Sequence, residues 1–312
     1  MKGDTVKFRV LSIPALSFAN RMVPAMRIMA LASMVVLAGC GGSHITFLDP
    51  QGPVAAQQRT HFLIIVGLMM VIVVPVLVLT PWLAWRYRYG SHHDYRPRWR
   101  FSWAWEIPLW GAPAAIVLIL AVFLWRNTTT LDPYDTLPIP GQPLRVQVIG
   151  FDWKWLFVYP ELGVASVDEL AFPAGRQLAL DLTSETVMQS FFIPALGSQV
   201  YAMAGMTTHL HLAADAPGRF RGLNTQYNGM HFDEQRFDAV ALTPRDFAAW
   251  VAKARTEGLA LDAAAYGVLA RRGTARRTAE TLGATLPLRF GAVSDGLFDH
   301  AVGHRHMPEP AR

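Results

Sequence analysis

The sequence predicts a membrane-spanning α-helical hairpin followed by an all-β domain with helices at its C-terminal end. Three observations predict this fold class: two long uncharged runs, a series of short alternating runs after residue 143, and a helix-start signal at residue 243. Hydrophobic residues make up 52% of the 312 residues, so the chain has room for membrane spans beside one domain of ordinary size.

The N-terminal segment has the pattern of a secretory signal. Arg27 precedes an apolar run over residues 28–37, and small residues then lead to Cys40, which resembles a bacterial lipoprotein signal. We expect residues 1–39 to be removed, the Cys40 thiol to carry a lipid anchor, and residues 40–60 to form a periplasmic segment. An ordinary signal or first membrane helix with an incidental cysteine is the alternative. Because Cys40 is the single cysteine, an internal disulfide and a cysteine-rich metal site are excluded.

The two uncharged runs predict membrane helices over residues 61–85 and 106–126. At about 1.5 Å per residue, each is long enough for the roughly 30 Å hydrocarbon core. The loop between them, residues 86–105, carries five arginines and one acid, so the positive-inside rule places it in the cytoplasm. The mature N-terminus and everything after residue 126 then face the periplasm of a bacterial inner membrane. Much of the net charge of +5 flanks the apolar runs, and no basic-aromatic motif indicates a nucleic-acid partner.

A Pro-rich linker, residues 127–143, leads to short runs typical of strands, which we assign to one domain over residues 144–243. The runs are Leu144 to Ile149, Trp153 to Tyr159, Gln177 to Thr183, Thr207 to Ala213, Gly218 to Leu223 and Arg236 to Leu242. Their spacing predicts a small β-sandwich or barrel.

The C-terminal part begins with a clear helix signal. Thr243 as N-cap and Pro244 at the first helical position predict a helix to Glu257. A second, Ala-rich helix is expected over residues 262–272, giving a helical extension over residues 244–283. The tail, residues 284–312, shows no clear period.

Four sequence blocks carry a family resemblance. They are Asp152-Trp-Lys-Trp155, Val187-Met-Gln-Ser-Phe-Phe-Ile-Pro194, Gly197-Ser-Gln-Val-Tyr-Ala-Met-Ala-Gly205 and Gly222-Leu-Asn-Thr-Gln-Tyr-Asn-Gly229. In this order they resemble subunit II of haem-copper oxidases, over roughly residues 48–251. The resemblance implies a cupredoxin-like fold for the periplasmic β-domain.

The same resemblance places this chain's residues at the copper-ligand positions of the copper-bearing relatives. Those positions hold Gln189, Asn224, Gln226, Asn228, Phe232 and Gln235. A binuclear copper centre needs soft thiolates and imidazoles, which amides and a phenyl ring do not replace. We therefore expect no metal in this chain. We expect Gln189, Asn224 and Asn228 to join their loops through amide hydrogen bonds instead.

Loss of the copper ligands makes the chain resemble the quinol-oxidising branch, the cytochrome bo type of ubiquinol oxidase. That resemblance implies a complex that oxidises ubiquinol, reduces oxygen to water and translocates protons, with the haems and one copper in partner subunit I. Smaller membrane subunits and membrane lipid are further expected partners, and cytochrome c is not. Two alternatives remain: a copper-bearing cytochrome c oxidase subunit II, and a free-standing periplasmic cupredoxin-like lipoprotein.

Several further residues are candidates for a role. Glu106 matches the glutamate that the family places at the mouth of a proton channel, which would give it a role in proton uptake. The alternative is a structural role, because an acid in the first turn of a helix interacts favourably with the helix dipole and could pair with Arg98 or Arg100. The two roles do not exclude each other. Trp153 and Trp155 match an aromatic pair of the relatives, and on one face of a strand they favour core packing. Five histidines could bind a metal: His209, His211, His300, His304 and His306. We favour ordinary strand positions for the first two and a solvated tail for the other three.

Overall fold

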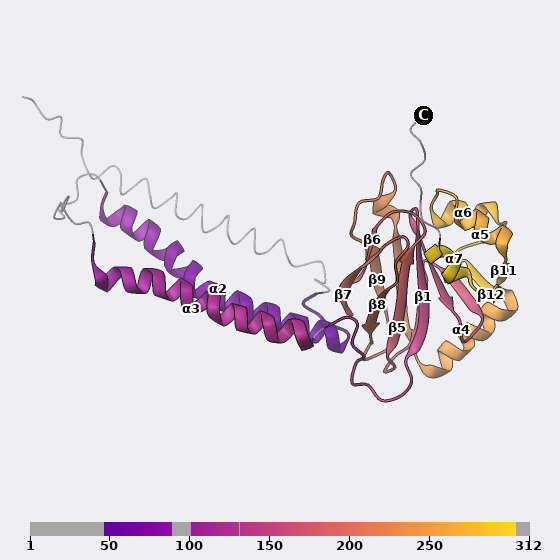
Figure 1. The fold of residues 1–312 in the computed structure, drawn as a ribbon, viewed down its shortest axis with the longest axis horizontal. Helices are drawn as coiled ribbons and strands as arrows, with labels where there is room; N and C mark the ends of the chain where they lie inside the picture. Colours follow the sequence, from indigo (N-terminus) through magenta and orange to yellow (C-terminus); the bar gives the residue numbers. More distant parts are fainter. Residues whose placement is uncertain (1–46, 89–100, 131, 304–312) are drawn as a thin grey trace, which may run out of the picture. The chain divides into compact units, whose positions relative to one another are not determined.

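The computed structural model describes residues 47–88, 101–130 and 132–303 (Figure 1). The predicted signal segment, Cys40 and the arginine-rich part of the loop lie outside these residues. The predicted fold class is confirmed: two long apolar helices precede a β-rich domain that carries further helices at its C-terminal end.

The helices α2 (Pro53–Arg86) and α3 (Trp103–Thr130) are long and apolar enough to cross a membrane. Their apolar side chains are largely exposed within the chain, as expected for surfaces that lipid covers. They contact each other through an edge-to-face pair between His61 and Phe123, with ring centroids 5.2 Å apart. The first helix begins at Pro53, earlier than the sequence predicts, because Pro at the first position and a polar first stretch extend it before the apolar run.

The β-domain consists of two sheets. The seven-stranded sheet has the order β11-β12-β3-β2-β1-β5-β8, and the five-stranded sheet has the order β4-β10-β9-β6-β7. The strands are β1 Leu144–Phe151, β2 Lys154–Tyr159, β3 Val164–Val167, β4 Glu169–Pro173, β5 Leu178–Ser184, β6 Gln189–Ile193, β7 Gly197–Ala202, β8 Thr208–Leu212, β9 Gly218–Asn224, β10 Arg236–Leu242, β11 Leu259–Leu261 and β12 Arg289–Val293. The six predicted runs correspond to β1, β2, β5, β8, β9 and β10, and the other strands are additional.

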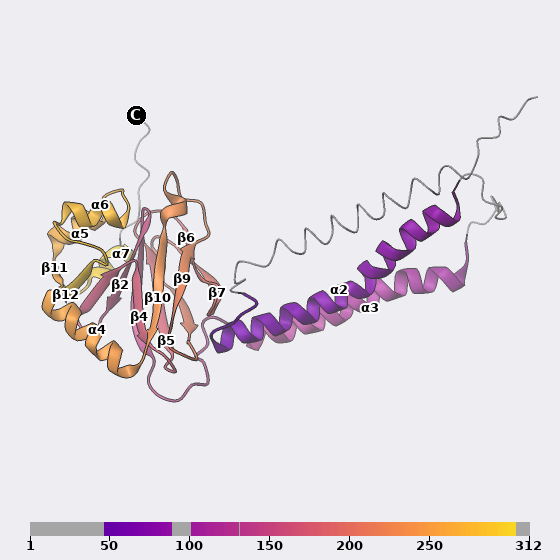
Figure 2. The same ribbon diagram turned by 180° about the vertical axis from the view of Figure 1, so that it is seen from behind.

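The seven-stranded sheet is buried on both faces at its centre. On β2, Trp155 and Phe157 face the core between the two sheets, whereas Leu156 and Val158 face a second core. This second core is closed by the C-terminal helices, which gather beside β11 and β12 in both views (Figures 1 and 2). Because both faces are covered, β2 is continuously apolar apart from Lys154.

The helix α4 (Pro244–Glu257) has the predicted bounds, and the Thr243 hydroxyl accepts from the Asp246 N–H as an N-cap should. The rest of the C-terminal part differs from the prediction. The expected second helix is the shorter α5, followed by a separate α6, and the tail contributes β12 and α7: α5 Ala263–Leu269, α6 Ala275–Thr281 and α7 Leu297–Gly303. The strand β12 pairs with β3, far away in sequence, so local periodicity did not reveal it.

Candidate functional site

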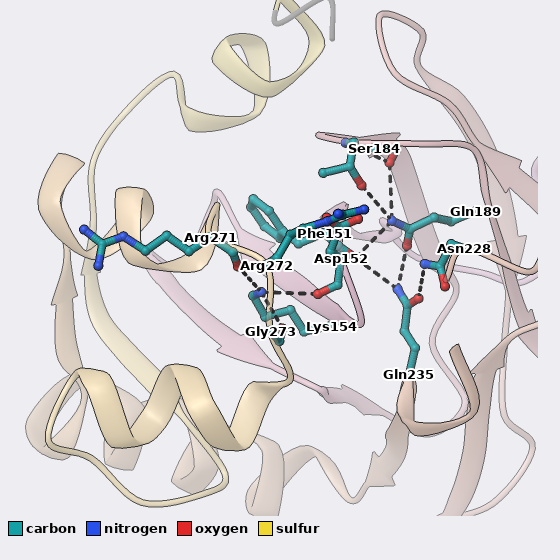
Figure 3. A network of polar contacts seen from close by, with 11 residues as sticks. Phe151, Asp152, Lys154, Ser184, Gln189, Asn228, Gln235, Arg271, Arg272 and Gly273 are labelled. Carbon is teal, nitrogen blue, oxygen red and sulfur yellow. Dashed lines mark hydrogen bonds and ion pairs between the residues drawn. The ribbon is translucent and has the colours of Figure 1, made fainter. Parts of the chain in front are cut away.

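Four buried amide side chains meet at one end of the β-domain, and we call Gln189, Asn224, Asn228 and Gln235 the amide network. Figure 3 shows three of them, Gln189, Asn228 and Gln235. Gln189 begins β6, Asn224 ends β9, and the other two follow in the loop before β10. All four side chains are at most 9% exposed. Residues that the sequence places at copper-ligand positions are therefore brought together by the fold.

Gln235 is the centre of the amide network. Its Oε1 accepts from Nδ2 of Asn224 at 2.9 Å and from Nδ2 of Asn228 at 2.7 Å. Its Nε2 donates to Oε1 of Gln189 at 2.6 Å. The expected amide cross-link is thus present, but the three residues named in the prediction bond through Gln235 rather than directly to one another.

Gln189 ties the amide network to the central sheet. Its Nε2 donates to the carbonyl of Phe151 at 3.0 Å, and Gln235 Nε2 reaches the same carbonyl at 3.3 Å. Gly150 of β1, in the other sheet, leaves space for the amide group of Gln189. A Cβ at this position would lie 2.7 Å from Gln189 Oε1. Gln189, Asn224 and Gln235 each donate and accept, which neutral side chains can do without burying a charge.

Asn224 ties the amide network to β6 and to the loop that follows β9. Its Oδ1 accepts from the main-chain N–H of Ser190 at 2.9 Å and of Gln226 at 3.0 Å, and its Nδ2 donates to the Gln226 carbonyl at 2.8 Å. Gln226 therefore contributes its main chain. Among the described residues, the Oδ1 of Asn228 is the one amide oxygen of the amide network without a hydrogen-bond partner.

The remaining predicted position, Phe232, and the neighbouring side chains of Met230 and His231 lie outside the amide network. Phe232 lies in a 3-10 turn and packs against Tyr227, with ring centroids 5.8 Å apart. Met230 is 84% exposed. Nδ1 of His231 lies 2.9 Å from a carboxylate oxygen of Glu234. The one imidazole and the one thioether of this loop are thus not directed at the amide network.

The two tryptophans of the first sequence block occupy different environments. Trp155 is fully buried and packs edge-on against Phe191, which agrees with the core-packing hypothesis. Trp153 is not on the same strand face, and that part of the prediction is wrong. It lies in the two-residue turn between β1 and β2 with a φ of 65°, where its ring contacts His231 and the guanidinium of Arg272. A tight turn, rather than a continuous strand, separates the two rings.

Sequence reasoning missed a second polar centre beside the same turn. We call it the charged clamp, and it consists of Asp152, Lys154 and the segment Arg271–Gly273 (Figure 3). The buried Nζ of Lys154 donates to the carbonyls of Arg271 at 2.9 Å, Gly273 at 2.8 Å and Asp152 at 3.3 Å. Oδ2 of Asp152 accepts from Nε of Arg272 at 2.9 Å. Lys154, the charged residue of the otherwise apolar strand β2, was the sequence feature that could have indicated the charged clamp.

Burial dominates the electrostatics of the charged clamp. Desolvation lowers the pKa of Lys154 to about 8, although Asp168 and Asp152 act in the opposite direction. Burial also raises the pKa of Asp168 to about 7, against the hydrogen bond from the Trp155 N–H and the charge of Lys154. Both groups therefore titrate near neutral pH.

Comparison with known proteins decides the family. Cytochrome bo(3) ubiquinol oxidase subunit 2 of Pseudomonas putida is 42% identical over 245 residues, which cover 78% of this chain and 77% of that protein. The chain belongs to the family of quinol oxidase subunit 2. Ubiquinol oxidase subunit 2 of Acetobacter aceti is 40% identical over 247 residues, 78% of this chain and 80% of that protein. The predicted resemblance is thereby confirmed over the cytochrome c oxidase alternative.

Two further comparisons concern solved structures and protein-family models. Among solved structures, the chain is similar to the periplasmic domain of subunit II of cytochrome oxidase of Bradyrhizobium japonicum, at 23% identity and a TM-score of 0.36, covering 38% of this chain and 98% of that one. No protein-family model matches the chain. Family membership and the two apolar helices together indicate a membrane-anchored subunit.

The donor set of this chain does not fit the binuclear copper centre of copper-bearing haem-copper oxidases. Its central atoms are amide oxygens and N–H groups that are already bonded to one another. A copper pair would need thiolates in place of Asn224 and Asn228, and an imidazole in place of the phenyl ring of Phe232.

Glu106 of the subunit lies in the first turn of α3, where its Oε2 accepts from Nε1 of Trp110 at 3.0 Å. Its two expected arginine partners lie outside the described residues. The histidines have separate surroundings. Nδ1 of His209 lies 2.8 Å from Asp181, His211 lies beside Gln177, and His300 packs against Tyr266, whereas His304 and His306 lie outside the described residues.

Proposed function

We propose that this chain is subunit 2 of a proton-translocating ubiquinol oxidase and carries no redox metal itself. One observation supports this most directly: the buried amide network, centred on Gln235, fills the positions of the copper ligands. Ubiquinol dissolves in the bilayer and can deliver electrons within the membrane, so a solvent-facing copper relay is unnecessary. The haems and one copper then belong to subunit I, which this chain supports together with smaller membrane subunits.

The test is metal analysis and activity of the complex purified through this chain. We expect ubiquinol oxidation by oxygen, no oxidation of reduced cytochrome c, and no more copper than the single ion assigned to subunit I. A purple dinuclear copper chromophore on this chain would contradict the proposal. Extraction of the chain alone, without a haem-bearing partner, would favour the alternative of a free-standing periplasmic lipoprotein.

We further propose that Glu106 takes up protons for the complex. It is a titratable group at the start of a membrane helix, beside the loop that the arginines assign to the cytoplasm. In Glu106→Gln, the amide oxygen can still accept from Trp110, but the side chain cannot ionise. We therefore expect slower oxygen reduction by a fully assembled complex. An unchanged rate would leave Glu106 with the role of a helix-start acid only.

We also propose that the mature chain begins at Cys40 with a lipid on its thiol. The support is the apolar run that precedes the single cysteine. Intact mass measurement of the purified subunit should give a chain starting at residue 40 plus diacylglycerol and acyl groups. Cys40→Ser should lack this added mass, and an unmodified wild-type chain would contradict the proposal.

A further inference from the structure

A groove with three arginines crosses the outer face of the five-stranded sheet, and we call it the arginine groove. It has a volume of about 440 Å³ and is lined by residues of β9, β10 and the turn between β3 and β4: Asp168, Arg219, Phe220, Arg221, Arg236, Phe237 and Asp238. The strands β9 and β10 are adjacent in Figure 2, and their pairing fixes the spacing of the charged side chains. The arginine groove is separate from the amide network, which is buried on the inner side of the domain end.

The cations of the arginine groove outnumber the acids that neutralise them. Asp238 forms an ion pair with Arg219 at 2.6 Å. Among the described residues, Arg221 and Arg236 have no ion pair or hydrogen bond of their side chains. The remaining acid, Asp168, accepts from the Trp155 N–H, and burial raises its pKa to about 7, so its charge is partly lost at neutral pH. Arg221 and Arg236 therefore have no ion-pair partner of their own among the described residues, and Asp168 offsets their charge only in part.

The register brings these two guanidinium groups within reach of one ligand. Arg221 is opposite Asp238, and Arg236 is opposite Leu223, so the two arginines occupy diagonal positions on the same sheet face. Diagonal neighbours in an antiparallel pair are about 7–8 Å apart, a distance that two long side chains can bridge around one anion. Guanidinium forks match phosphate oxygens, and a phosphate group offers several acceptors at once.

We propose that the arginine groove binds a phosphate group, held mainly by Arg221 and Arg236. Arg219 lies beside them, but its charge is offset by Asp238. The same chemistry is offered by free phosphate and by the headgroup of an anionic lipid, and the experiment separates these sources. The arginine groove is independent of electron transfer, so its test does not depend on the proposed oxidase function.

The test uses the complex purified in dodecyl maltoside, which contains no phosphate group. Inorganic phosphate is titrated while hydrogen exchange of the β9 and β10 amides is followed. We expect protection that saturates with phosphate in wild type. The variants Arg221→Gln and Arg236→Gln should each bind about tenfold more weakly, as expected for loss of one charge-assisted contact. The double variant Arg221→Gln/Arg236→Gln should show no saturable protection. Its control is Arg245→Gln/Arg276→Gln, which removes two exposed arginines outside the arginine groove.

A second arm places the complex in nanodiscs that contain phosphatidylglycerol, without free phosphate. If β9 and β10 are protected in these nanodiscs, and the double variant Arg221→Gln/Arg236→Gln loses that protection, the lipid headgroup is the source of the phosphate group. If only inorganic phosphate gives protection, the source is the free anion. No saturable protection in either arm would overturn the proposal and leave the arginines as a solvated face. Equal loss in the control variant would also overturn it, since the effect would then be one of net charge.

Discussion

The amide network and the charged clamp meet at the same turn between β1 and β2, but they hold it in different ways. The amide network reaches the Phe151 carbonyl through neutral side chains. The charged clamp reaches the neighbouring Asp152 through a buried ammonium group and an ion pair. The first joins loops of the two sheets, and the second fastens the segment between α5 and α6 to the central sheet.

This difference predicts how the stability contributed by each centre depends on pH. A neutral network is fully effective at any pH at which the protein is folded, because its members carry no charge that must be desolvated. A buried ammonium group must be desolvated, and this cost is visible in its lowered pKa. We therefore expect the copper-ligand positions to contribute stability that is independent of pH, and the charged clamp to contribute stability that depends on pH.

The largest effect is expected for Gln235→Leu. This change leaves Gln189 Oε1 and Asn228 Nδ2 buried without their hydrogen-bond partner. At about 1–3 kcal/mol for each of these two unsatisfied groups, the β-domain should lose about 2–6 kcal/mol of unfolding free energy. Urea unfolding of the full-length chain in detergent measures this loss, which should be the same at pH 6 and pH 9.

Gln226→Leu is the matched control, because Asn224 binds only the main chain of Gln226. Its cost should stay below about 1 kcal/mol. If the two variants were equally destabilised, the hydrogen bonds of Gln235 would not be what holds these loops together.

A smaller and pH-dependent effect is expected for Lys154. Its pKa is about 8 in the folded chain and 10.5 when unfolded, so unfolding between these values takes up a proton. The unfolding free energy of wild type should therefore rise from pH 8 to pH 10.5, by at most about 3 kcal/mol. The Lys154→Met variant should lack this rise, and the difference between the two proteins cancels the titration of other groups. Lys253→Met, at an exposed pair with Glu257, should keep the rise. A parallel pH profile for Lys154→Met would show that the ammonium is not desolvated.

Asp168 gives a change of opposite sign. Its raised pKa means that the folded chain retains a proton that the unfolded chain has lost, so stability falls as the pH rises from 3.8 to about 7. Above pH 7, Asp168→Asn should stabilise the β-domain by about 1–2 kcal/mol, after allowance for solvent in the arginine groove. Asn keeps an oxygen for the Trp155 N–H and tolerates the φ of 55° at this position. Asp238→Asn, which breaks a surface pair, should give no gain, and a loss of stability in Asp168→Asn would contradict a desolvated carboxylate.

The features that the sequence predicted correctly depend on local patterns. The membrane helices follow from uncharged length, and α4 follows from Thr243 and Pro244, so neither needs knowledge of distant contacts. The copper-ligand positions were assigned by the resemblance of the four sequence blocks to subunit II of haem-copper oxidases. The sequence did not predict that Gln235, rather than Gln189, is the centre of the amide network. This depends on which side chains converge in space, and the spacing of residues along the chain does not contain that information.

The features that the sequence did not predict depend on long-range contacts. The strand β12 is defined by its pairing with β3, and Lys154 finds its partners more than a hundred residues away. Trp153 was assigned to a strand because Trp155 follows at strand spacing, but the turn interrupts that spacing. Alternation indicates a strand only while both residues remain in it.

The smallest effect is expected at the exposed edge of the charged clamp. Arg272 pairs with Asp152 but is itself 76% exposed, so water and salt screen the pair. Arg272→Gln should cost about 0.5–1 kcal/mol at low ionic strength, and the difference should disappear at about 1 M salt, where the screening length is about 3 Å. Arg271→Gln is the matched control, because Lys154 binds the main chain of Arg271 and not its side chain. A loss of several kcal/mol that persists in high salt would mean that the stacking of Arg272 on Trp153, rather than the ion pair, fixes this segment. The charged clamp would then depend on a desolvated contact at its surface as well as on the buried ammonium group of Lys154.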